Sequence, residues 1–143
     1  MATSATVEAT GLQVVSAGGV ANATVIDGGG SATVLKSGTA SGTIIRPGGV
    51  ETVSGTDVGA RISAGEQDVF GLASGATIFV GGDQSIESGG TASGTTVLLG
   101  GAEQVFSGAV AVGTVVSNLA PNTSLAARPG PSLTPGIGNQ RRQ

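Results

Sequence analysis

An aliphatic residue recurs along this chain at a nearly constant interval. The recurring positions are Val15, Val34, Val53, Val69, Ile86 and Val105. They lie 19, 19, 16, 17 and 19 residues apart, and two further columns keep the same step, as in Val34, Ala40 and Ile45. A fixed period near 20 residues is typical of a solenoid, in which each repeat packs only on its neighbours. We therefore expect the function to lie on the surface of an array.

The composition favours β-structure for these repeats. Among 143 residues there are 27 glycines and three phenylalanines, with no Cys, Trp, Tyr or His. The apolar residues are mainly Val, Ile and Ala, and β-branched side chains suit a pleated surface. Glycine shows no three-residue period, which excludes collagen. A mean hydropathy of +0.30 with 10% charged residues is opposite to the signature of disorder.

Each repeat is predicted to contain two strands separated by glycine-rich turns. The first strands are 12–16, 31–35, 51–54, 67–70, 84–87 and 103–106, and the second are 22–26, 41–45, 58–62, 74–79, 93–98 and 112–116. Glycine pairs such as Gly18-Gly19 supply the positive φ of tight corners. Hairpins within a repeat are the alternative. Like residues at like positions favour a parallel β-helix instead, with about six rungs of roughly 19 residues.

The array is predicted to span residues 1–118, followed by a separate tail over 119–143. Four of the five prolines lie in the tail, and proline cannot donate to a strand ladder. We expect the tail to be disordered or extended. The array carries all nine acids and three basic residues, a net charge of −6, which is unsuited to nucleic acid.

Two polar columns accompany the apolar ones. Glutamine or glutamate stands two residues before the core aliphatic at Gln13, Glu51, Gln67, Gln84 and Glu103. We expect these side chains to line an outer edge. Threonine follows the alanine column by three residues at Thr24, Thr43, Thr95 and Thr114, and the column is interrupted by Arg61 and Ala76.

The two short repeats concentrate charge. The candidate surface cluster is Asp57, Arg61, Glu66, Asp68 and Asp83. One interpretation is that a corner is shortened there and carries a surface ion pair. The other is that the irregularity forms a binding site on an otherwise regular rod. Glu66 and Asp83 each lie three residues before a core aliphatic, so they are expected to stack about 5 Å apart, as paired carboxylates could in a carbohydrate-active β-helix. Tight corners in place of long loops disfavour a catalytic cleft.

Other chemistry is excluded by what the sequence lacks. Without His, Cys or Tyr there is no triad, imidazole base or thiol nucleophile. No calcium-binding repeat or phosphate-binding loop is present, so no catalytic, cofactor or metal residues are predicted. No stretch of 18 apolar residues predicts a membrane span, and the first ten residues, MATSATVEAT, show no signal peptide.

The repeat resembles the AIDA-type autotransporter passenger repeat over residues 1–118, best seen in DQSIESGGTASGTTVLLGG (83–101) and GLQVVSAGGVANATVIDGG (11–29). The shared features are Gly-Gly corners, a Q-x-[VI] strand and an A-S-G-T-x-[VI] strand. The resemblance implies a right-handed parallel β-helix, exported through an outer-membrane barrel and displayed at the cell surface or outside the cell. It also implies O-glycosylation, and the matching hydroxyls are Thr24, Ser41, Thr43, Ser93, Thr95 and Thr114.

We therefore expect a structural and interaction module, not an enzyme. Its partners would be other copies, through exposed strand edges at the ends of the solenoid, and host or neighbouring-cell surfaces. Three alternatives remain: a carbohydrate-binding or carbohydrate-active β-helix using Glu66 and Asp83, an ice-binding threonine array, and a non-functional fragment of a larger passenger.

Overall fold

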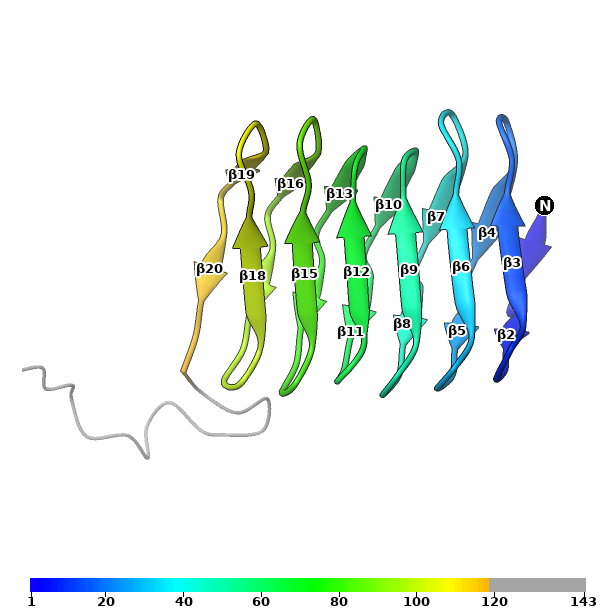
Figure 1. The fold of residues 1–143 in the computed structure, drawn as a ribbon, viewed down its shortest axis with the longest axis horizontal. Helices are drawn as coiled ribbons and strands as arrows, with labels where there is room; N and C mark the ends of the chain where they lie inside the picture. Colours follow the sequence, from blue (N-terminus) through cyan, green and yellow to red (C-terminus); the bar gives the residue numbers. More distant parts are fainter. Residues whose placement is uncertain (119–143) are drawn as a thin grey trace, which may run out of the picture.

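The computed structural model describes residues 1–118, which coil into a parallel β-solenoid of 20 short strands without a helix. Each rung contributes one strand to each of three sheets (Figure 1). Every strand pairs in parallel with its equivalent in the next rung, so residues of the same column lie side by side. The predicted solenoid of about six rungs is confirmed, and the predicted tail, 119–143, lies outside the described residues.

The strands fall into three sheets. The first sheet holds β1 (Ala2–Thr3), β4 (Val20–Asn22), β7 (Thr39–Ser41), β10 (Thr56–Val58), β13 (Leu72–Ser74), β16 (Thr91–Ser93) and β19 (Val110–Val112). The second holds β2 (Thr6–Val7), β5 (Val25–Ile26), β8 (Ile44–Ile45), β11 (Arg61–Ile62), β14 (Thr77–Ile78), β17 (Thr96–Val97) and β20 (Val115–Val116). The third holds β3 (Leu12–Val15), β6 (Ser31–Val34), β9 (Val50–Val53), β12 (Glu66–Val69), β15 (Asp83–Ile86) and β18 (Ala102–Val105).

The coil is right-handed, as the resemblance implied. In Figure 1 the third-sheet strands run upward at the front, and the chain returns behind them while advancing from the N-terminal end at the right. Rotation and advance have the same sense, which defines a right-handed coil. Parallel strands joined by crossovers take this hand in nearly all proteins, because of the twist of the strands.

The prediction of two strands per rung was wrong, because the second predicted strand is bent into two. In the first full rung the bend is at Ala23, whose φ is 55°, and in the next rung it is at Gly42, whose φ is 68°. A left-handed residue ends one strand and turns the chain into the next sheet. The resulting rung is triangular, with a first-sheet strand of three residues and a second-sheet strand of two.

The interior is filled by stacks of like residues, one stack for each apolar column of the sequence. Val34, Ala40 and Ile45 are each at most 2% exposed, as are their equivalents in the central rungs. Val15, not Val14, occupies the core, because strand alternation points Val14 outward, where it is 48% exposed. Burying each Val or Ile contributes about 1.5–3 kcal/mol, so these columns are the main source of stability.

The third and fourth rungs are both shortened at the corner between the third and first sheets, and the third rung also loses one residue between β11 and β12. Two residues connect β9 to β10, whereas four connect β6 to β7. The shorter loops are visible at the tops of these rungs in Figure 1. Gly71 forms one such corner, and a Cβ there would collide with the carbonyl oxygen of Gly55 in the preceding rung. Glycine is therefore required where the corner backbones approach each other.

Replacing Ile45 with alanine tests the inward assignment, with Ile44→Ala as the matched control on the adjacent residue. Ile45 is fully buried, while Ile44 is half-buried on the outer face. Ile45→Ala is expected to lower the free energy of unfolding by about 2–5 kcal/mol, because it opens a cavity between two rungs. Ile44→Ala should cost less than about 1 kcal/mol. Denaturant unfolding of the two variants checks this, and equal losses would contradict the register.

Candidate functional site

A polar column runs inside the coil beside the apolar ones. Glu51, Gln67 and Gln84 are at most 1% exposed, so the expectation that they line an outer edge was wrong. Side chains two apart on a strand share a face, and each of these residues stands two before an inward Val or Ile. Alternation therefore places them inside despite their polarity.

Hydrogen bonds join this column across three rungs. The Nε2 of Gln67 donates to Glu51 Oε2 and to Asp57 Oδ2, each at 2.7 Å. The Nε2 of Gln84 donates to Gln67 Oε1 at 2.6 Å, and Thr95 Oγ1 donates to Gln84 Oε1 at 3.1 Å. An unpaired buried polar group costs free energy. A rung that slipped out of register would leave these amides and carboxyls without hydrogen-bond partners.

The threonine column lies next to the polar column within each rung. Thr24 Oγ1 donates to Gln13 Oε1 at 3.0 Å, and Thr114 Oγ1 donates to Glu103 Oε2 at 2.8 Å. The prediction that Arg61 interrupts the threonine column was wrong. Because Arg61 pairs with Ile44, Ala60 takes the threonine position in that rung.

The prediction that Asp57 belongs to a surface cluster was wrong. Asp57 pairs with Ala40 on one side and Ala73 on the other, so it occupies the inward alanine column of the first sheet. It is 1% exposed, which removes it from the predicted surface cluster. The residue type of Asp57 gives no sign that it belongs to the alanine column. Its position follows only when the residues between Ala40 and Ala73 are counted with the shortened corners included.

Glu51 and Asp57 form a buried acid pair that shares one amide donor. Burial raises the pKa of Glu51 from 4.5 to about 8, and repulsion from Asp57 adds to the shift, while hydrogen bonds from Gln67 and Thr43 oppose it. Burial also raises the pKa of Asp57 from 3.8 to about 6. At neutral pH Glu51 therefore holds its proton, and the pair avoids burying two charges. Because the pair is enclosed inside the coil, its geometry supports a role in holding neighbouring rungs in register.

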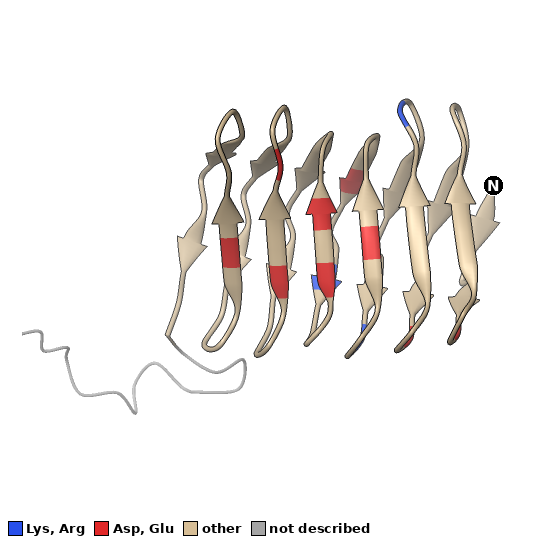
Figure 2. Cartoon of the chain, in the orientation of Figure 1, with Lys and Arg blue, Asp and Glu red and all other residues tan. Residues whose placement is uncertain are grey.

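The rest of the predicted surface cluster lies on two different faces. Glu66, Asp68 and Asp83 project from the third sheet, whose acidic strands are shown in Figure 2, whereas Arg61 belongs to the second sheet. Glu66 and Asp83 are neighbours in register, as predicted. Gln104 Nε2 donates to Asp83 Oδ2 at 2.6 Å. Partial burial, followed by repulsion from surrounding acids, raises the pKa of Asp68. The five residues therefore do not form one site.

The hydroxyls matched to glycosylation positions are also divided. Thr24, Thr43 and Thr95 are at most 2% exposed, so these hydroxyls are not accessible in the folded array. Ser41 and Ser93 are half-buried on the first sheet, where an acceptor role stays a prediction. Thr114 is half-buried in the last described rung, and its acceptor role likewise stays a prediction.

Within residues 1–118, no helix is long and apolar enough to cross a membrane. The same part of the chain brings together no group of three or more acidic, His or Cys side chains able to hold a metal ion.

The buried acid pair gives the stability an unusual pH dependence. The folded pKa values of Glu51 and Asp57 lie above their unfolded values, so the folded chain holds protons that the unfolded chain releases. The free energy of unfolding should therefore decrease as pH rises from about 4 to about 8. Glu51→Gln should flatten most of this decrease, and Glu66→Gln, an exposed acid on the next strand, should leave it in place. Urea unfolding at pH 5, 6.5 and 8 measures the slope. An increase in wild-type stability across this range would refute the assignment.

Comparisons with known proteins agree with this architecture. A family model described as the adhesin of bacterial autotransporter systems, probable stalk, matches residues 9–66. The crystal structure of a TibA fragment, hyper-glycosylated by TibC catalysis, superposes with a TM-score of 0.52 at 28% identity. The match covers 78% of this chain and 56% of the TibA fragment, so the chain spans little more than half of that structure. No curated protein matches the sequence. The family match over residues 9–66 and the fold shared with the TibA fragment agree with the resemblance of these repeats to AIDA-type autotransporter adhesin repeats.

Proposed function

We propose that this chain is a passenger segment of a bacterial autotransporter adhesin, acting at the cell surface without catalysis and associating with other copies through its end rungs. The adhesin stalk model and the TibA fragment support the passenger role. The exposed inner columns of the last described rung support self-association, and they are the observation that carries it.

The last described rung presents core positions to its outer side. Val116 is 77% exposed, although Val97, its partner in the preceding rung, is 5% exposed. Val105 is 49% exposed, although its partner Ile86 is fully buried. Strands β18, β19 and β20 each pair with one neighbour among the described residues, and an unpaired strand edge is a template for another chain.

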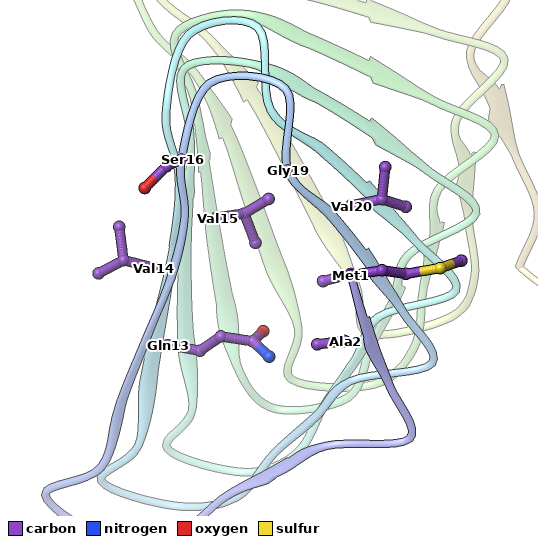
Figure 3. Close-up of a pocket in the computed structure, with 9 residues that line it drawn as sticks. Met1, Ala2, Gln13, Val14, Val15, Ser16, Gly19 and Val20 are labelled. Carbon is purple, nitrogen blue, oxygen red and sulfur yellow. The ribbon is translucent and has the colours of Figure 1, made fainter.

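The first rung forms the opposite end, where the inner-column residues Val7 and Val15 are only 6% and 5% exposed. A hollow there is lined by Ala2, Gln13 and Val15 together with Met1, and in Figure 3 the side chains of Gln13 and Val15 point into the coil. Both ends of the described array therefore have unpaired strand edges, β1 and β2 at one end and β19 and β20 at the other.

A head-to-tail junction follows from the common register. If β19 and β20 pair with β1 and β2 of a second copy, Ala111 stacks on Ala2 and Val116 stacks on Val7. The third sheet has six strands against seven in each of the others, so one of its strand positions stays open at this junction. The contact is heterologous, and repetition of it produces rods.

Val116→Lys tests this junction, with Val115→Lys as a control on the same strand. Val116 belongs to the inner column, whereas Val115 faces outward. Sedimentation velocity of the full chain should show stacks that grow with concentration. Val116→Lys should weaken association by about tenfold or more, because a charge would be buried at the junction. Val115→Lys should not. A wild-type chain that remains monomeric at high concentration, or equal effects of the two variants, would reject the proposal.

A further inference from the structure

The second sheet carries a shallow hollow that the self-association proposal does not use. It is lined by Ile44, Arg46, Arg61, Ser63 and Phe79. Two of the array's three basic residues, Arg46 and Arg61, therefore line one surface feature. The remaining one, Lys36, lies in the turn between β6 and β7.

The hollow exists because a small residue stands in a column of large ones. Arg46, Ser63 and Phe79 directly follow the second-sheet strands of successive rungs, and their backbone amides bond to equivalent carbonyls one rung back. Ser63 is thus flanked by a guanidinium on one side and an aromatic ring on the other. Rungs about 4.8 Å apart place the backbones of these two flanking residues roughly 10 Å apart.

Arg61 is held in an orientation suited to binding an anion. Its guanidinium carbon lies 5.0 Å from the centroid of the Phe79 ring, a cation–π contact. In the strand register its neighbours are Ile44 and Thr77, so the charge is peculiar to this rung. The one ion pair among residues 1–118 joins Arg46 and Asp27, which leaves Arg61 without a carboxylate partner there. A guanidinium lying over a ring keeps N–H groups available for a planar carboxylate.

Arg46 adds a second donor and a neighbouring acceptor. Its Nη1 lies 2.9 Å from Asp27 Oδ1, with side-chain exposures of 55% and 32%. An exposed ion pair of this kind contributes little to stability, so a ligand can compete for its groups at small cost. The hollow thus combines guanidinium donors, a serine hydroxyl and the apolar surfaces of Ile44 and Phe79, and the carboxylate of Asp27 is paired with Arg46 beside it.

We propose that this hollow binds a carboxylate-bearing sugar. The carboxylate would lie against Arg61 and the sugar hydroxyls would contact Ser63 and the Arg46–Asp27 pair. Guanidinium and hydroxyl groups beside the apolar surfaces of Ile44 and Phe79 suit a hydroxylated anion, and the acidic charge elsewhere on the array confines an anion to this face. The inference rests on the proposed adhesin role, for which it supplies a ligand class, but not on stacking between copies.

Titration of the full chain with glucuronic acid, N-acetylneuraminic acid and neutral glucose, followed by amide chemical shifts, tests the site. Either acidic sugar should produce saturable shifts at Arg61 and Ser63, with a dissociation constant of roughly millimolar order, and glucose should not. Arg61→Gln should weaken binding about tenfold or more, and Lys36→Gln should leave it unchanged. Because Arg61 is exposed, its replacement should leave the far-UV circular dichroism spectrum unaltered.

The same titration on Val116→Lys separates this proposal from self-association. Binding that persists in this variant would place the site on the single array and support the inference, whether or not copies stack. An absence of saturable shifts with both acidic sugars would overturn it. Equal binding of glucose, or equal weakening in Lys36→Gln, would also overturn it.

Discussion

The parallel ladder between consecutive rungs is the interaction on which this structure depends. Each strand is two to four residues long and too short to be stable alone, yet all are held because each pairs with an equivalent on the neighbouring rung. The ladder forces residues of one column into contact, so each side chain in a column must pack against a similar side chain on the neighbouring rung. This explains why Val, Ile and Ala fill a narrow triangular interior without aromatic side chains.

The polar column obeys the same constraint with different chemistry. A buried acid on one rung needs a donor on the next, and Gln67 supplies two bonds from one amide while accepting a third from Gln84. An apolar column can tolerate a neighbour of similar size, but an amide pairs only with a correctly placed acceptor. The hydrophobic columns therefore account for most of the stability, and the polar column specifies which residues lie opposite one another.

The periodic apolar residues made the fold predictable, since Val34, Ala40 and Ile45 are repeated often enough to reveal both period and packing. Other features depend on information that residue type does not carry. The bend was missed because Ala23 carries no glycine signal and the equivalent Gly42 is a single glycine, unlike the glycine pairs that mark the other corners. Asp57 was misplaced because the shortened corner before it shifts the count by two residues. The sugar hollow spans three rungs around Ser63, so no local motif announces it.

The direction of the ladder bonds also determines how the rod responds to force. Strands lie across the rod axis, and the hydrogen bonds between rungs run along it, so axial tension on the chain loads one ladder at a time. The rod is then expected to peel from an end instead of shearing as a unit. A rung of 19 residues that occupies about 4.8 Å of the rod releases roughly 65 Å of extended chain. A short, stiff array is therefore expected to lengthen in steps when its end is pulled, because each rung that unfolds releases its extended chain.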